Sequence, residues 1–263
     1  MSKIVQKDSL LNYVERGSGE PILLIHGLFG SLENLNMIAR ALEQDYRVVS
    51  VDVRNHGSSF HHKSMNYKDM AQDILDLVEH LQLENFHLLG HSMGGKIAMQ
   101  FALQHPEKVN KLIVADIAPV QYEHHHNEII SGLLSIDIDE ITNRNDADKQ
   151  LAQYVDEVGV RQFLLKNIAK GDQCFYWRAN IENIANDYAE VVKGNEHDSA
   201  FDGETLFIKG SNSNYILAEH RAEIGKLFPK SKGRIIQGVG HWLHAEKPAA
   251  FNKIVTDFLK LNN

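Results

Sequence analysis

Residues 88–100 read LLGHSMGGKIAMQ and contain the pattern Gly-x-Ser-x-Gly with Ser92 at its centre. Apolar residues precede the pattern, and those that follow, among them Ile97 and Phe101, recur at the spacing of one helix face. In a strand-turn-helix setting, this pattern lifts a nucleophilic serine out of the backbone. Five residues alone recur by chance, so an ordinary loop serine stays open as the alternative. A nucleophilic Ser92 needs partners elsewhere in the chain.

Short apolar runs alternate with helical patterns over most of the chain. Such runs suit strands that are buried on both faces of a mainly parallel sheet. Apolar side chains at helix spacing fill residues 66–81, and a last helix begins near Pro248. The pattern predicts an α/β fold in which helices flank the sheet. The runs fall at residues 21–25, 47–51, 86–89, 111–115 and 205–208, with a weaker one at 233–237.

Residues 120–200, here named the cap segment, break this alternation. The stretch between Ile117 and Thr205 is far longer than an ordinary connection, so it must form structure of its own. It reads as helices without a convincing strand. We therefore predict a core at 1–119 and 201–263, with a helical cap over the carboxyl edge of the sheet. The expected helices lie around 127–135, 147–157, 160–169 and 181–192.

The charge of the 263-residue chain is unevenly distributed. The net charge is −8, which argues against nucleic acid as a partner. The cap segment holds 15 of the 35 acidic residues but 7 of the 27 basic ones, so it carries the whole excess. We expect this charge to disfavour anionic substrates unless Arg161, Lys166 or Arg178 lines the entrance to the site. Neutral substrates should then be turned over faster than anionic ones.

Composition excludes several other classes of protein. Cys174 is the single cysteine, so neither a disulfide framework nor a cysteine-rich zinc site can form. No run approaches the roughly 18 apolar residues of a membrane-spanning helix, and the first residues carry no apolar leader. The sequence therefore predicts a cytoplasmic protein without a membrane span.

Three more stretches at strand ends suit a site around Ser92. His241 follows the last strand in GVGHWLHAEKP, and Asp116 ends another strand in VADIAPV. The order serine, aspartate, histidine is that of a Ser-His-Asp triad on an α/β-hydrolase sheet. HGLFG at 26–30 can aim the backbone N–H of Leu28 or Phe29 at an oxyanion, with the N–H of Met93 as second donor.

Taken together, HGLFGS, VDVRNHGSS, GHSMGG, DIAPV, GSNSNY and GHWLHAEKP resemble the α/β-hydrolase superfamily, and within it the bacterial YbfF-type esterase group. The resemblance covers nearly the whole chain. It implies a serine carboxylesterase that acts on short acyl esters, with acyl-CoA thioesters as a further substrate class and no cofactor. Ser92 would then be the nucleophile and His241 the base.

The triad acid departs from the superfamily pattern. Most members carry it in the loop after the seventh strand, but residues 209–215, KGSNSNY, contain no carboxylate. Asp198 and Asp202 precede that strand, at its wrong end, and Glu219 belongs to the next helix. Asp116 ends the neighbouring strand within plausible reach of the same histidine, so we assign the acid there. The alternative role for Asp116 is a cap of the segment that follows it.

The remaining histidines fit structural roles better than catalytic ones. His26 and His91 flank the motifs and are expected to shape loops, and His244 should face away from the site. The run His124-His125-His126 reads as a solvated helix start, so no metal site is expected. Arg54 should pin the loop that it begins.

Aromatic residues are the candidates for substrate contacts. Phe163 and Trp177 of the cap segment could roof an acyl pocket, together with Trp242 beside His241, although aromatics at helical spacing are more often plain core. A C–C bond hydrolase acting on a diketone would use the same residues, and a hydrolase-fold binding protein would use none. Acyl length, leaving group and oligomeric state stay open.

Overall fold

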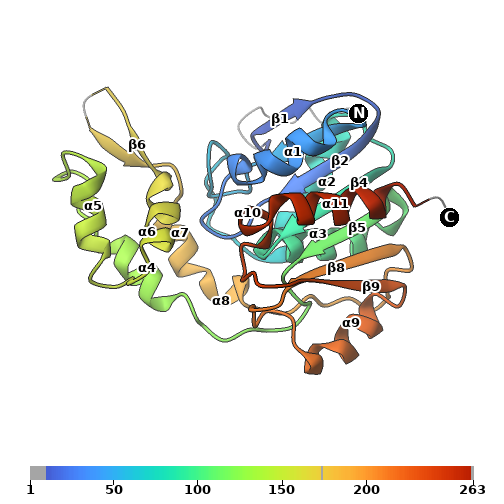
Figure 1. Cartoon of the computed structure of the whole chain (residues 1–263). Coiled ribbons are helices and arrows are strands. Elements are labelled where there is room, and N and C mark those ends of the chain that lie inside the picture. Colours follow the sequence, from blue (N-terminus) through green and yellow to red (C-terminus); the bar gives the residue numbers. More distant parts are fainter. Residues whose placement is uncertain (1–9, 173, 262–263) are drawn as a thin grey trace.

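The computed structural model describes residues 10–172 and 174–261, and within them a seven-stranded sheet forms the centre of the molecule (Figure 1). The strand order is β1-β3-β2-β4-β5-β8-β9. Only β1 runs antiparallel to its neighbour among these pairs, so the predicted mainly parallel sheet is confirmed. The strands are β1 (Tyr13–Arg16), β2 (Glu20–Ile25), β3 (Tyr46–Val51), β4 (Phe86–His91), β5 (Val109–Ala115), β8 (Glu204–Gly210) and β9 (Ser231–Ile236).

All six predicted strands form, and β1 is the one strand of this seven-stranded sheet that sequence analysis missed. Its four residues pair with β3 at the edge of the sheet, and their side chains are half-buried or exposed. An edge strand of this kind needs no apolar run, because its outer side meets water. The apolar pattern that predicted the others was therefore absent.

Helices cover both faces of the sheet and enclose two apolar layers. Alternate side chains of one strand enter different layers: Leu23 and Ile25 pack with α2 and α3, whereas Ile22 and Leu24 pack with α1 and α11. The helices of this part are α1 (Asn36–Leu42), α2 (Tyr67–His80), α3 (Met93–Gln104), α9 (Arg221–Leu227), α10 (Leu243–Glu246) and α11 (Pro248–Leu259). Short 3-10 turns add Leu32–Leu35, Pro106–Lys108 and Ala218–His220.

The cap segment lies to one side of the sheet, at the left of Figure 1. Its helices are α4 (Asn127–Leu134), α5 (Arg144–Leu151), α6 (Val158–Leu164), α7 (Ile181–Asn186) and α8 (Tyr188–Val191), with a 3-10 turn at Leu165–Asn167. The expectation that it contains no strand is wrong. β6 (Ile168–Lys170) and β7 (Phe175–Trp177) form an antiparallel hairpin closed by a hydrogen bond from Gly171 N to Cys174 O at 2.8 Å. Three-residue strands are too short to show a periodicity.

The parallel strands bring distant loops to one edge of the sheet. Ile25 pairs with Gly90, and His91 pairs with Ala115, so β2, β4 and β5 end side by side. The segments that follow them begin at His26, Ser92 and Asp116. Carboxyl ends of parallel strands are where α/β folds bind ligands. Among the helices that the structure describes, none is both long and apolar enough to cross a membrane.

Candidate active site

Ser92 occupies a sharp turn between β4 and α3. Its backbone has φ 55° and ψ −123°, which a residue with a side chain rarely adopts. Two glycines make the turn possible, because a Cβ on Gly90 would lie 2.1 Å from Gly94 O and one on Gly94 would lie 2.3 Å from Ile25 O. The turn therefore projects the hydroxyl of Ser92 away from the backbone, above the first turn of α3.

Three sequence-predicted residues meet at this turn. Ser92 Oγ lies 2.9 Å from His241 Nε2, and His241 Nδ1 lies 2.7 Å from Asp116 Oδ2. In this arrangement the serine hydroxyl donates to Nε2 while Nδ1–H donates to the carboxylate. The sequence separations are 149 and 125 residues, so the fold alone creates these contacts.

The carboxylate of Asp116 is fully buried and has three donors. Besides His241 Nδ1–H it accepts from the Gly210 N–H, at 3.0 Å to Oδ1, and from the Ser213 hydroxyl at Oδ2. The backbone of Asp116 has a φ of 52°, and its N–H donates to Ile208 O at 2.8 Å. A buried carboxylate with this set of donors is held in one orientation. The 209–215 loop, which lacks an acid, thus supplies donors to the acid of the neighbouring strand.

The imidazole of His241 is held on two further sides. Its ring stacks on Tyr215, with centroids 4.0 Å apart and planes 25° apart, and its carbonyl oxygen lies 2.8 Å from His91 Nε2. Burial holds the pKa of His91 well below its usual range, so His91 is a neutral donor. The ring of His244 packs on His91 at 4.4 Å, and burial lowers the pKa of His244 to about 4. Both His91 and His244 line the cavity that Ser92 borders, so the expectation that His244 faces away from the site is wrong. Among the described residues, His241 and neither of these two is hydrogen-bonded to the Ser92 hydroxyl.

The loop 26–30 lies beside the Ser92 turn, since a Cβ on Gly27 would lie 3.1 Å from the Cβ of Ser92. The prediction named Leu28 or Phe29, but the N–H of Phe29 donates to His56 Nε2 at 3.1 Å. Phe29 therefore has no free donor, and that alternative is wrong. Within the described residues the amides of Leu28 and Met93 donate to no protein group. The amide of Met93 belongs to the first turn of α3, where helix N–H groups lack intrahelical partners.

His26 shapes this loop as expected. Its Nδ1 lies 2.8 Å from Gly27 O, and its Nε2 accepts from Val53 N at 3.0 Å. Arg54 pins the next loop: it makes a two-pronged ion pair with Asp73, at 2.6 and 2.8 Å, in a buried position.

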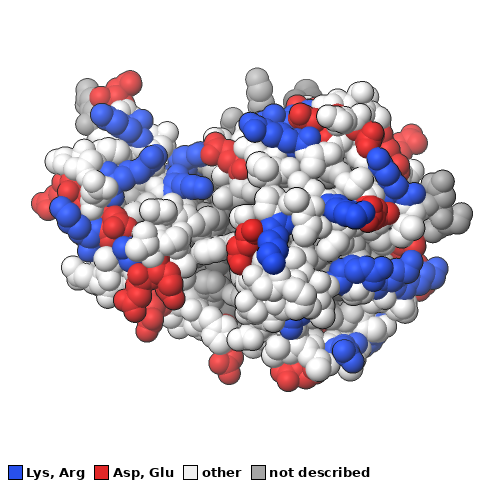
Figure 2. Space-filling view, viewed as in Figure 1, with Lys and Arg blue, Asp and Glu red and all other residues white. Residues whose placement is uncertain are grey.

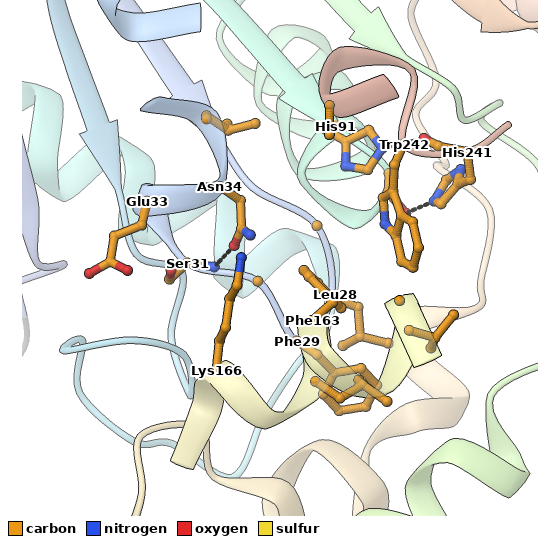
Figure 3. A pocket seen from close by; sticks show the side chains of 18 of the residues that line it. Leu28, Phe29, Ser31, Glu33, Asn34, His91, Phe163, Lys166, His241 and Trp242 are labelled. Carbon is orange, nitrogen blue, oxygen red and sulfur yellow. Dashed lines mark hydrogen bonds between the residues drawn. The ribbon is translucent and has the colours of Figure 1, made fainter. Parts of the chain in front are cut away.

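A cavity of about 820 Å³ opens above Ser92, between the strand ends and the cap segment (Figure 3). Phe163 of α6 and Trp242 both line it, and their ring centroids are 5.4 Å apart. The prediction for Trp177 is wrong. This side chain lines a separate hollow with Leu133 and Ile181, because β7 turns it toward α4 and α7.

Basic side chains of the cap segment reach the same cavity. Arg144, Lys166 and Arg178 line it, and Figure 3 shows Lys166 pointing toward Asn34. In Figure 2 basic side chains lie across the upper part of the cap segment as far as the hollow beside the sheet, with others at its outer side among acidic ones, and an acidic patch lies on its lower edge. Arg161, the third residue considered from sequence, is buried and paired with Asp148 at 2.8 Å. Glu33 and Glu246 are the carboxylates of the lining.

His126 is a lining residue that sequence analysis treated as solvated. Its Nδ1 lies 2.7 Å from the hydroxyl of Tyr188, and burial lowers its pKa to about 4. It borders both the large cavity and a smaller one beside Ser92. Only this histidine of the 124–126 run lines the large cavity, and the described residues contain no group of three or more potential metal ligands.

Residues 20–248 match the family described as alpha/beta hydrolase fold. The chain therefore belongs to the alpha/beta hydrolase fold family, as the order of its motifs indicated. The match covers every segment that contributes to the site, from the loop after β2 to the loop after β9.

Several curated proteins are similar over almost the whole chain. A putative esterase/lipase of Haemophilus influenzae is 42% identical over 99% of this chain and 91% of its own length. Esterase YbfF of Escherichia coli is 39% identical over 92% of this chain and 94% of its own length. The sn-1-specific diacylglycerol lipase ABHD11 of Mus musculus is 40% identical over 90% of this chain and 80% of its own length. Among solved structures, a marine microorganism esterase is 41% identical, with a TM-score of 0.92 over 95% of this chain and 99% of the other.

Proposed function

We propose that the chain is a serine carboxylesterase that cleaves short acyl esters, and acyl-CoA thioesters as a second substrate class, through an acyl-enzyme. Ser92 is the nucleophile, His241 the general base and Asp116 the residue that orients the imidazole. The N–H groups of Leu28 and Met93 bind the oxyanion. Residues 120–200 act as a cap that forms the roof of the substrate cavity.

The chemistry follows from the positions of the protons. His241 Nε2 takes the Ser92 proton as Oγ attacks the carbonyl carbon, and the oxyanion accepts the two N–H groups. The imidazolium then gives that proton to the leaving oxygen or sulfur, which departs as alcohol or thiol. A water attacks the acyl-enzyme by the same route and releases the carboxylic acid. Asp116 keeps the proton of the neutral imidazole on Nδ1 and stabilises the cation.

The observation that carries the proposal is the continuous hydrogen-bond series from Ser92 Oγ through His241 to Asp116, on a turn that exposes the hydroxyl. The relatives named esterase or lipase support it, because they align over nearly the whole chain. A two-carboxylate or metal-based hydrolysis would call for other residue types at this position.

The lining of the large cavity revises the expected preference between neutral and anionic substrates. The sequence predicted faster turnover of neutral substrates than of anionic ones, which means short-chain esters faster than acyl-CoAs. That prediction rested on the overall charge of the cap segment. Arg144, Lys166 and Arg178 line the cavity, so its mouth carries more positive charge than that segment as a whole. We therefore infer that an anionic group on the leaving side is accepted, with a rate that falls as salt screens the field.

Two measurements test this function. A fluorophosphonate probe should label the wild-type protein, and Ser92→Ala should remove the label. Purified protein should then hydrolyse p-nitrophenyl acetate and acetyl-CoA, with kcat/KM for the thioester decreasing between low and physiological ionic strength. Absence of labelling together with absence of hydrolysis would contradict the esterase function. If the probe labels the protein and the ester is hydrolysed but the thioester is not, only acyl-CoA is excluded as a substrate class.

A further inference from the structure

Ser92 borders two cavities of very different size. Besides the large one of about 820 Å³, a small cavity of about 40 Å³ is also lined by Ser92. Leu28, Ser92 and His126 belong to both linings. The small cavity is otherwise bounded by apolar and aromatic side chains, namely Tyr67, Met93, Ile117, Tyr122, Tyr188, Val191, Val192 and Tyr215, with Lys96, Glu123 and His125.

The direction of proton transfer decides which part of an ester lies in which cavity. The leaving atom must receive its proton from His241 Nε2, so the leaving group departs on the side where His241 is accessible. His241 and its neighbour Trp242 line the large cavity, whereas neither lines the small one. The acyl group stays bonded to Ser92 after this step, and the small cavity contains both Ser92 and Met93.

We propose that the small cavity is the acyl pocket and that the large basic cavity holds the alcohol or thiol part of the substrate. This assignment rests on the proposed function. It makes the enzyme selective for short acyl groups joined to large leaving groups. The walls that set the acyl length are Ile117 of the loop after β5 and Val191 and Val192 at the end of the cap segment.

The size of the pocket sets the acyl length. A single water molecule needs roughly 10–15 Å³ of cavity volume. The small cavity of about 40 Å³ therefore holds about three non-hydrogen atoms. Beyond the carbonyl group, which stays at Ser92, an acetyl, propionyl or butyryl group adds one, two or three carbon atoms and satisfies this limit. An octanoyl chain does not, and it would have to displace the wall.

Lys96 fixes that wall in place. It lies on α3, one turn after Ser92, and its buried ammonium group donates to Val120 O at 2.7 Å and to Lys193 O. These carbonyls stand at the two ends of the cap segment. The ammonium also lies over the rings of Tyr122 and Tyr67, at 4.7 and 5.5 Å. Because one side chain ties both ends of the cap segment together, the pocket between them has little freedom to widen.

Two isomeric esters test the assignment on the wild-type protein. Octyl acetate and ethyl octanoate have the same formula and similar hydrophobicity, but they exchange the lengths of the acyl and alcohol parts. We expect kcat/KM for octyl acetate to exceed that for ethyl octanoate by about tenfold or more, since a misplaced methylene alone costs tenfold in a tight pocket. Equal rates, a reversed order or no cleavage of octyl acetate overturns the acyl-pocket assignment.

The outcome for p-nitrophenyl acetate separates this failure from that of the proposed function. If that activated ester is hydrolysed in a Ser92-dependent manner while the isomers show the wrong order, only the assignment of the two cavities fails. If it is not hydrolysed and no phosphonate label forms, the esterase function fails and the acyl pocket with it.

A matched pair of substitutions locates the wall. Val192→Ala removes two methyl groups from the small cavity, so the octanoate-to-acetate ratio of kcat/KM for p-nitrophenyl esters should rise about tenfold. Val158→Ala makes the same chemical change in the cap segment at a side chain that is 54% exposed and borders neither cavity. It should leave that ratio unchanged. Equal ratios in the two variants, with folding verified by circular dichroism, overturn the assignment of the wall.

Discussion

Replacing Asp116 by asparagine tests the arrangement that departs most from the superfamily pattern. Oδ1 of the native side chain accepts from Gly210 N–H and Oδ2 accepts from His241 Nδ1–H. In Asp116→Asn the amide oxygen keeps the Gly210 bond, and the NH₂ group then faces Nδ1. The imidazole is driven to carry its proton on Nε2, which points at Ser92 and can no longer accept the serine proton. The expected loss is up to about 10⁴-fold in kcat, or roughly 5.5 kcal/mol of activation free energy.

Ser213 offers a way to restore the carboxylate. Its hydroxyl donates to Asp116 Oδ2 from a buried position, so it stands next to the atom that His241 contacts. A Ser213→Asp substitution in the Asp116→Asn background replaces this hydroxyl by a carboxylate on the same Cβ atom. Superfamily relatives carry their acid near this point of the loop. We expect the double variant to recover about tenfold or more of the lost kcat.

The assay is kcat for an activated short-chain ester, with circular dichroism as the check on folding. Asp198→Asn and Asp202→Asn serve as controls, since Asp202 lines a hollow at the opposite end of β8 and both precede that strand. Each control should stay within about twofold of wild type, as surface substitutions usually do. Near-native turnover in Asp116→Asn, or a crippled control, would refute the assignment of the acid.

Three further perturbations have defined outcomes. Ser92→Ala should lower kcat by about 10⁴-fold or more at unchanged stability, and retention of a tenth of wild-type kcat would discard the nucleophile. His241→Ala should lower kcat by about 10⁴-fold or more, because no base then accepts the Ser92 proton, and full activity in that variant would contradict the role of His241. Burial lowers the pKa of Lys96 from 10.5 to about 7, so between these values the unfolded chain binds the extra proton and stability should rise with pH. Lys96→Met should abolish that rise in the denaturant midpoint, and an unchanged slope would show that Lys96 keeps its ordinary pKa.

The sequence was sufficient for six of the seven strands of the sheet and for the three residues that meet at Ser92, and the reason is topological. Parallel strands all end at one edge, so a polar residue directly after an apolar run can be assigned to that edge without knowledge of its contacts. Ser92, Asp116 and His241 each follow such a run. The same reasoning rejected Asp198 and Asp202, because they precede their strand, and Asp202 lines a hollow at the opposite end of β8. Strand ends therefore carry positional information that most of the chain lacks.

The residues that sequence analysis missed act through contacts that no local pattern reveals. Ser213 and Tyr215 belong to a loop that was noted for its lack of an acid. The Ser213 hydroxyl nevertheless donates to Asp116, and the Tyr215 ring stacks on His241. Trp177 was assigned to the pocket from its residue type and its place in the cap segment. A hairpin has two opposite faces, and the Trp177 side chain lines the hollow beside Leu133 and Ile181 instead of the large cavity. Residue type predicts that an aromatic packs, but the path of the backbone decides where.

The charge of the cap segment shows why a sum over residues is a poor guide to a cavity. At physiological ionic strength the field of an exposed charge decays over about 8 Å, so acids on the outer surface contribute little at the mouth. Three basic residues line the cavity itself, namely Arg144, Lys166 and Arg178. Arg178 forms an ion pair with Glu33, with 3.7 Å between Nη1 and Oε1. Neither Arg144 nor Lys166 has a carboxylate within 4 Å among the residues that the structure describes. Arg144 donates to Ile168 O at 2.9 Å, so Lys166 is the one of the three for which the structure gives no hydrogen bond or ion pair. Charge selectivity at this site therefore depends on a few side chains of the lining, and the net charge of 120–200 has little influence on it.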